Sequence, residues 1–176
     1  MIRSTRWMVV AALLPVAACS SNSSQPVSAA PAAPALAAVD TTFLNTVAGG
    51  DAGQIQMGQL AVSKAHGRAA KQFASKMVAD HTAVDQQAMT LAQSKGITAD
   101  ATPLQMQTDM LGTLNSAKPA AFDRDYLRGQ VVAAQTFLKA FQDEAANGED
   151  ADIKAFASST LPALQQHLVL ARRLAR

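Results

Sequence analysis

The sequence predicts an all-α protein, a four-helix bundle with a short extra helix in the crossover between the second and third bundle helices. Apolar residues recur at intervals of three and four over most of the chain after Asp40, which is the period of an amphipathic helix. Gly and Pro interrupt this pattern at points where helices would end. The length of 176 residues, with 49% hydrophobic and 5% aromatic residues, suits one domain packed with Ala, Leu and Met.

The first expected helix starts with Asp40 as its N-cap and runs to about residue 65, where His66-Gly67 ends it. Gly49-Gly50 and Gly53 lie in its first half. Each costs about 1 kcal/mol of helix stability relative to Ala. The sequence therefore favours a bend in this half of the helix.

The second expected helix covers residues 68–95 and ends at Gly96, a residue type that often follows the last turn of a helix. Its apolar face, with spacings of three and four, consists of Ala70, Ala74, Met77, His81, Val84, Ala88 and Leu91. Pro103 opens a shorter helix over residues 103–115.

Residues 120–147 form the fourth expected helix, which Gly148 ends. The last helix covers residues 150–174 with Asp150 as its N-cap. Its apolar face consists of Ile153, Ala157, Thr160, Leu164, His167, Ala171 and Leu174. Pro162 removes one backbone hydrogen bond within this helix, which predicts a kink before His167.

The lengths of the connections predict the topology. Tight turns join the first two long helices and the last two, whereas residues 96–119 form a long connection that contains the short helix. Two antiparallel hairpins joined by one long crossover have the connectivity of ferritin-like bundles. The sequence therefore predicts a ferritin-like bundle over residues 39–176.

Residues 1–18 have the features of a lipoprotein signal peptide. Arg3 and Arg6 precede an apolar segment that is too short to span a membrane. Val16-Ala17-Ala18 then lead to Cys19, the only cysteine, in the order aliphatic, small, small, Cys that a lipobox requires. We expect cleavage before Cys19 and lipidation of its thiol. The alternative is an ordinary secretory signal, cleaved after residue 18, with an incidental cysteine.

Residues 19–38 contain mostly Ser, Ala and Pro and carry no charge, so we interpret them as the lipidated cysteine and a flexible tether. Ser20 follows the cysteine, where Asp would signal retention in the inner membrane of enteric bacteria. The sequence thus predicts a bacterial envelope protein that binds the membrane through its lipid anchor. The outer membrane is favoured, with the domain in the periplasm.

The charge of the expected mature chain is balanced. Loss of residues 1–18 leaves 13 basic and 13 acidic residues. A neutral domain has no whole-molecule field to attract nucleic acid or anionic lipid, so neither is expected as a partner on charge grounds. With the only thiol acylated, the fold depends on burial and not on disulfides.

Four segments in order resemble the domain-of-unknown-function 4142 family: Gln54–Ala61, Met77–His81, Phe122–Tyr126 and Leu161–His167. The resemblance covers about residues 40–174. Members of this family are bacterial envelope proteins with a ferritin-like bundle and no settled activity. The resemblance implies the same fold here and supplies no reaction.

Two positions depart from the pattern of the family. Its members usually carry Glu at the position of Gln54 and His at the position of Gln135. If the core of the family binds a metal, two potential ligands are neutral amides in this chain.

The residues themselves do not form a di-iron signature. Such bundles need a Glu three residues before a His on each of two helices, so that both ligands share one helix face. Val78 and Leu164 occupy these positions before His81 and His167. Oxidase or ferroxidase chemistry is therefore not expected.

A simpler metal site stays open. His81 and His167 lie on the apolar faces of different helices and could meet across the core, with Asp85 one turn beyond His81 and Asp51 on the first helix. Two imidazoles and a carboxylate would suit zinc or copper, and iron stays possible.

The alternative to a metal is a satisfied polar core with no cofactor. Each His would then be neutral and hydrogen-bonded to a buried partner, with the candidates Gln54, Asp80, Tyr126 and Gln135. Asp80 points about 100° away from its neighbour His81 around the helix. It is expected to pair with a base on another helix or to be solvated.

No nucleophile elbow, P-loop or dinucleotide motif occurs, so the chain is not expected to be an enzyme. The first hypothesis is an envelope lipoprotein that binds another protein or has a structural, stress-related role. The second is a metal-binding bundle that uses His81 and His167. The third is a carrier of small apolar ligands, which would need a sizeable cavity lined by Met57, Met77, Met89, Met106 and Met110.

Overall fold

The computed structural model describes residues 36–176, which form five helices and no strand. The helices are α1 (Ala38–Lys64), α2 (Arg68–Ser94), α3 (Gln105–Ser116), α4 (Pro119–Asn147) and α5 (Ala151–Leu174). All five expected helices are confirmed, with small differences at their ends. The predicted signal peptide, the predicted lipidation site Cys19 and the tether up to residue 35 lie outside the described residues.

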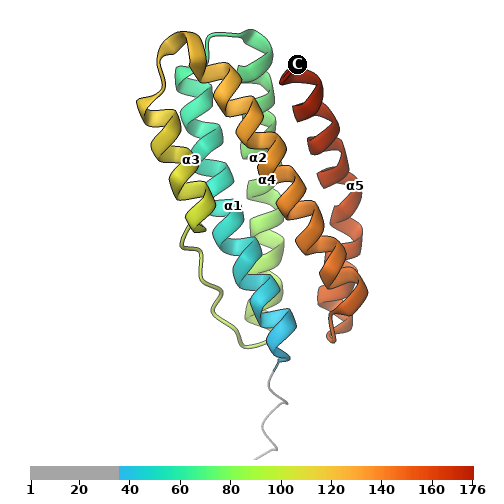
Figure 1. Cartoon of the computed structure of the whole chain (residues 1–176). Coiled ribbons are helices and arrows are strands. Elements are labelled where there is room, and N and C mark those ends of the chain that lie inside the picture. Colours follow the sequence, from blue (N-terminus) through green and yellow to red (C-terminus); the bar gives the residue numbers. More distant parts are fainter. Residues whose placement is uncertain (1–35) are drawn as a thin grey trace, which may run out of the picture. The chain divides into compact units, whose positions relative to one another are not determined.

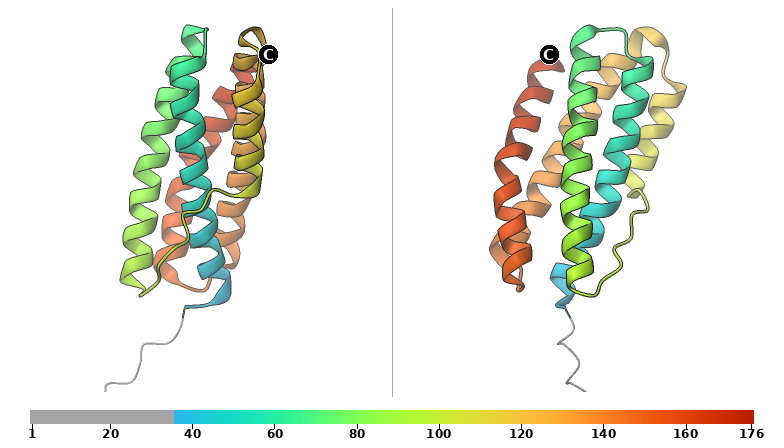
Figure 2. Two further views of the ribbon diagram at one scale, coloured as in Figure 1. Left: turned by 90° about the vertical axis from the view of Figure 1, so that its left-hand side faces the viewer. Right: turned by 180° about the vertical axis from the view of Figure 1, so that it is seen from behind.

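The four long helices form a bundle of two antiparallel hairpins, α1–α2 and α4–α5 (Figure 1). The connection after α2 runs along the side of the bundle to α3, so α2 and α4 point in the same direction (Figure 2). The helix α1 also packs against α4, and α2 against α5, while α3 packs on α1 and α4. This arrangement confirms the predicted ferritin-like bundle with a short helix in its crossover.

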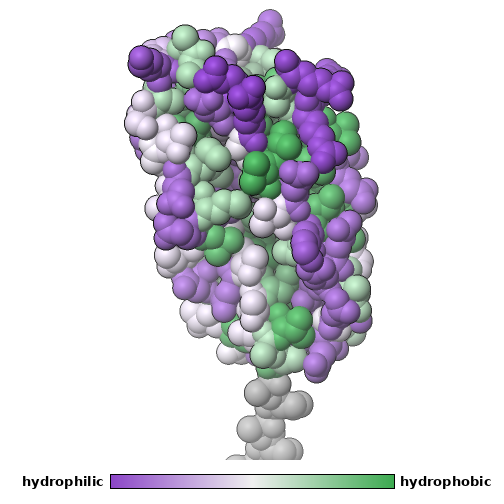
Figure 3. Space-filling model, viewed as in Figure 1, coloured by the Kyte–Doolittle hydropathy of each residue, from purple (hydrophilic) through white to green (hydrophobic). Residues whose placement is uncertain are grey.

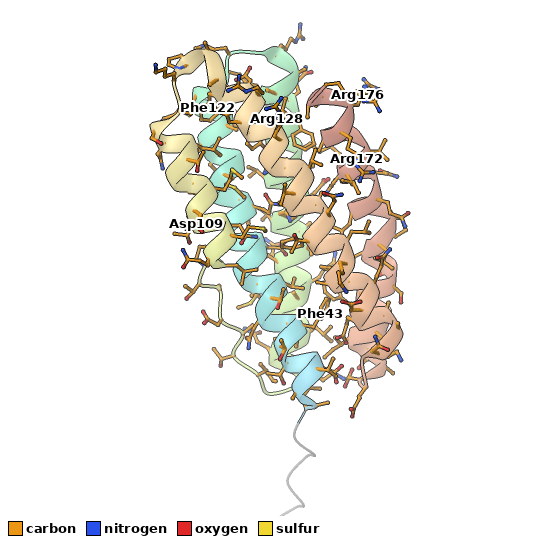
Figure 4. All side chains as sticks on the ribbon, viewed as in Figure 1. Phe43, Asp109, Phe122, Arg128, Arg172 and Arg176 are labelled. Carbon is orange, nitrogen blue, oxygen red and sulfur yellow. The ribbon has the colours of Figure 1, made fainter. Side chains whose placement is uncertain are left out.

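The core consists of two apolar clusters, each with residues from all four long helices. The first contains Phe43 and the second contains Phe122, and Figure 4 shows these two residues toward opposite ends of the bundle. The two clusters leave a layer between them at the middle of the bundle. The candidate site lies in this layer.

Two glycines of α1 allow close approach of other elements. A Cβ on Gly50 would lie 2.1 Å from Cζ of Phe137 on α4, and a Cβ on Gly53 would lie 2.5 Å from Cβ of Gln107 on α3. The helix continues through both glycines without a break. Their lack of a side chain therefore serves packing. Gly96, with a φ of 72°, follows α2 in the left-handed conformation expected of a residue at this position.

The predicted N-cap at Asp40 is wrong. Helix α1 begins earlier, with Ala37 at the N-cap position, and Asp40 is fully buried. Its carboxylate accepts hydrogen bonds from the backbone N–H groups of Glu149 and Asp150, at 2.9 and 3.1 Å. Asp40 thus satisfies donors in the turn before α5, which is a tertiary contact that local sequence does not reveal. The predicted N-cap at Asp150 is confirmed.

A second buried acid, Glu144, lies beside Asp40 and is only 2% exposed. Burial, and then the neighbouring carboxyl group of Asp40, raises the pKa of Glu144 to about 7. Glu144 therefore keeps its proton to a higher pH than an exposed glutamic acid does.

No helix within residues 36–176 has both the length and the apolarity that crossing a membrane would need.

Candidate functional site

A layer of buried polar side chains crosses the middle of the bundle between the two apolar clusters. We call it the polar layer, and every long helix contributes to it. Its members are Asp51 and Gln54 from α1, His81 from α2, Gln130 from α4 and His167 from α5. Each of these side chains needs a partner, since an unpaired polar group in a protein core is costly.

His81 is paired with Asp51. The distance from Nδ1 of His81 to Oδ1 of Asp51 is 2.6 Å, and both side chains are buried. Burial raises the pKa of Asp51, although the hydrogen bond to His81 partly opposes this effect. This contact leaves Nε2 of His81 for another partner. The second carboxylate oxygen of Asp51 has no partner among the described residues.

His167 is paired with Asp80, with 2.6 Å between Nε2 of His167 and Oδ2 of Asp80. Burial lowers the pKa of His167, so its imidazole is neutral at pH 7. Partial desolvation of Asp80 would raise its pKa, but hydrogen bonds from Lys76 and His167 outweigh this and lower it. The ionised Asp80 therefore accepts the Nε2–H of His167. Nδ1 of His167 keeps its lone pair and, among the described residues, has no partner.

The two imidazoles lie next to each other in the core. Their ring centres are 5.5 Å apart and their planes are inclined by 45°. Phe137 packs edge-on against His81, with 5.6 Å between ring centres, and helps to hold that ring in place. This geometry agrees with the expectation that His81 and His167 meet across the core.

The pairing with carboxylates determines what the site can do. Each imidazole is oriented through one nitrogen, which is how carboxylates in the outer shell of metal sites position histidine ligands. Across residues 36–176, no group of three or more His, Cys, Asp or Glu side chains is placed to hold an ion together. An ion in the polar layer would therefore have two imidazole ligands, supported from behind by Asp51 and Asp80.

Two other residues predicted to lie beside the histidines, Asp85 and Gln54, form no hydrogen bond with them. Asp85 is half-buried, and this burial raises its pKa. Its charge in turn raises the pKa of Asp51, which is its effect on the site. Gln54 accepts a hydrogen bond from Gln130 at 2.8 Å. The amide pair thus links α1 to α4 and is separate from the His–Asp pairs.

The remaining core candidates have different outcomes. The prediction of Gln135 as a buried partner is wrong, because Gln135 lies on the outer face of α4 and is exposed. Tyr126 is buried as predicted and packs against Phe73, with ring centres 6.1 Å apart. Burial raises the pKa of Tyr126 well above its usual value. Within the described part of the chain its hydroxyl has no partner, so it does not serve the histidines.

Gln130 is the member of the polar layer that the sequence analysis missed. It lies four residues after Tyr126 and seven before Phe137, and all three are buried. These spacings place Gln130 on the inward face of α4, so the helical period alone could have identified it.

The sequence analysis also did not identify Lys76 as a second partner of Asp80. The two side chains are 2.7 Å apart, and their spacing of four residues on one helix predicts such a pair.

The methionines do not form a ligand chamber. Met57, Met106 and Met110 line a cavity of about 10 Å³ together with Gln107. Such a volume is about the space that one water molecule needs. Among the described residues, nothing in this region offers an apolar ligand of several heavy atoms a place to bind.

The comparison with protein families decides the relationship. The model of the family described as Domain of unknown function (DUF4142) matches residues 25–174. The chain belongs to the DUF4142 family. The match includes the whole polar layer of this DUF4142 protein and confirms the resemblance seen in its sequence motifs. No curated protein matches the sequence.

Solved structures resemble the DUF4142 bundle. CopM in the Cu(II)-bound form has a TM-score of 0.66 at 18% identity and covers 77% of this chain and 95% of its own. CopM in the Cu(I)-bound form has a TM-score of 0.65 at 18% identity, with 76% and 93% covered. The conserved hypothetical protein rv2844 from Mycobacterium tuberculosis has a TM-score of 0.62 at 16% identity, with 78% and 90% covered. These matches show a shared helical-bundle fold.

Proposed function

We propose that this DUF4142 protein is an envelope lipoprotein whose bundle binds one copper ion between His81 and His167. One observation carries the proposal. Two buried imidazoles lie with their ring centres 5.5 Å apart, each is fixed by a carboxylate through one nitrogen, and each has a second nitrogen left for a ligand. Nδ1 of His167 in particular is buried with no partner in the part of the chain that the structure describes.

The number and type of donors favour monovalent copper. Zinc sites use three or four protein ligands, and magnesium and calcium prefer oxygen. Imidazole nitrogen suits copper, and the monovalent ion is stable with as few as two such donors. CopM, which has the same fold, is described in Cu(I)-bound and Cu(II)-bound forms and so supports this choice.

The burial of the site favours holding an ion over catalysis. The histidine side chains are 4% and 5% exposed, so a substrate has no direct access to an ion between them. Asp51 and Asp80 keep the free nitrogens in place when no ion is bound. Copper would add a positive charge that these carboxylates balance.

Competition for Cu(I) against a chromophoric chelator, without oxygen, tests the site. The protein is the full chain with Cys19→Ser, so that the thiol cannot act as a ligand. We expect one Cu(I) per chain, and a loss of affinity of at least tenfold, about 1.4 kcal/mol, in His81→Asn and in His167→Asn. The control is His66→Asn, because His66 is exposed in the turn between α1 and α2.

Two results would contradict the copper site. The first is a wild-type chain that is folded by circular dichroism but binds no Cu(I). The second is equal binding by the variants and the wild type. If copper does not bind and the variants unfold more easily, the His–Asp pairs are structural, and the role of the bundle lies in contacts with another protein.

The anchor is a separate part of the proposal and needs its own measurement. It is supported by the small residues before Cys19 and by the uncharged segment after it. Mass spectrometry of the protein extracted from envelopes should find an N-terminal cysteine with attached acyl chains. In high salt, which screens attraction by charge, Cys19→Ser should move the protein out of the membrane fraction. A chain that begins at Cys19 or later and carries no acyl group would refute the lipid anchor.

A further inference from the structure

The fold separates the charges of the chain along the bundle. Nine exposed basic residues gather at the end where α1 turns into α2 and where α5 finishes, and we call this the basic end. They are Lys64, Arg68, Lys71, Lys118, Arg124, Arg128, Arg172, Arg173 and Arg176. Figure 4 shows Arg128, Arg172 and Arg176 in this region, and Figure 3 shows hydrophilic side chains gathered over it.

The other end of the bundle is acidic. It holds seven acids, namely Asp40, Asp100, Asp143, Glu144, Glu149, Asp150 and Asp152. Three lysines lie there, and two of them are paired: Lys95 bridges Asp150 and Asp152, and Lys139 pairs with Asp143. A domain that is close to neutral as a whole therefore presents a strongly basic surface locally. The sequence analysis expected no attraction to anionic partners because the net charge is zero. That reasoning does not apply to the basic end, where positive charge is concentrated.

Stability of the fold does not explain the basic end. Basic residues in the last turn of α5 suit the negative end of a helix dipole, but Arg68 and Lys71 begin α2 and face the positive end of its dipole. Within residues 36–176, a single ion pair involves a member of the basic end, Arg124 with Asp125. Lys64 also donates to Asn115, at 3.4 and 3.5 Å. Two acids, Asp123 and Asp125, lie among these charges, so the basic residues far outnumber them and repel one another. This excess of positive charge points to a partner.

The shape and composition of this surface select the class of partner. Every Phe and Tyr within residues 36–176 is buried, so at the basic end the imidazole of exposed His66 is the ring that a base could reach. The charges come from the ends of α1, α2, α4 and α5, which meet at one blunt end of the bundle (Figure 1). Arg173 also lines a surface hollow on α5. A blunt basic surface fits a plane of negative charge. Clusters of about four to eight Lys and Arg residues are typical of attachment to anionic lipids.

We propose that the basic end docks on the surface of an anionic phospholipid bilayer. Attraction to phosphate groups of the lipid would orient the bundle with its long axis away from that surface, while the acidic end would be repelled by it. The docking depends on charge alone and needs neither copper nor the lipid anchor. Its failure would therefore leave the copper site and the anchor untouched.

Vesicle flotation tests the docking. The full chain with Cys19→Ser, free of copper, is mixed with vesicles of phosphatidylcholine alone or of phosphatidylcholine with phosphatidylglycerol, in low and in high salt. Arg172→Gln/Arg173→Gln removes two charges from the basic end. Lys139→Gln/Lys154→Gln removes the same charge from the acidic end and is the matched control. Circular dichroism verifies that each variant is folded.

The expected result is binding to phosphatidylglycerol vesicles that high salt abolishes. The arginine variant should bind about tenfold more weakly or worse, and the lysine control should bind like the parent. Equal effects of the two variants would mean that net charge alone acts, and the docking surface would be refuted. Equally tight binding to DNA, with the same dependence on the arginines, would overturn the assignment to lipid.

Discussion

A rise in pH from about 4.5 to about 7 should weaken the fold, because only the native state keeps the proton of Glu144 over this interval. Burial and the neighbouring carboxyl group raise the pKa of Glu144 from 4.5 to about 7. Between these two pH values the native state binds a proton that the unfolded chain releases. Each pH unit of this interval is worth about 1.4 kcal/mol, so the free energy of unfolding should fall by at most about 3 kcal/mol as the pH rises through it.

Urea unfolding at about pH 5 and about pH 8 measures this effect as the difference between wild type and Glu144→Gln. The amide does not titrate, so the variant should lack this loss of stability at the higher pH. Other groups titrate equally in both proteins and cancel in the difference. Glu149→Gln is the control, because Glu149 is exposed, and it should behave like wild type. If Glu144→Gln follows the wild-type pH dependence, a raised pKa of Glu144 is not its cause.

Three further substitutions test the packing and the site by urea unfolding. Gly50→Ala should lose about 1–3 kcal/mol, because its Cβ would overlap Phe137 at 2.1 Å. A Cβ on Gly112 has nothing within 4 Å, so Gly112→Ala should gain about 1 kcal/mol of stability from its higher helix propensity. If both glycine variants change the free energy of unfolding in the same direction, the role of close approach is refuted. Asp51→Ala leaves buried Nδ1 of His81 unpaired and should cost about 2 kcal/mol or more, and an unchanged midpoint would contradict the pairing.

The fold could be predicted because local signals suffice for a helical bundle. Spacings of three and four identified the inward faces of α2 and α5, and Gly96 and Asp150 marked helix ends through backbone conformation and capping. The length of the crossover then distinguished the ferritin-like order of helices from a simple up-and-down bundle. Asp40 was misassigned because its partners lie more than a hundred residues away.

The site was only half predictable for a related reason. Periodicity gives the face of a helix on which a residue lies, so it located His81 and His167, but it does not fix how far one helix slides along the next. The slide decides whether Asp51 or Asp85 meets His81. It also decides that Asp80, which seemed to point away from the site, reaches His167 from the neighbouring helix.

The two apolar clusters explain why the bundle tolerates a polar layer at its middle. Each cluster joins all four long helices, so the helices are held together on both sides of the histidines. Replacing both partners of a buried hydrogen bond with apolar side chains of similar shape can be nearly neutral or stabilising, so the His–Asp pairs are not what the bundle needs in order to fold. A packing layer would gain nothing from an imidazole with a buried, unpartnered nitrogen, as at His167, whereas a ligand site requires one. This difference favours a binding role for the layer over a purely structural one.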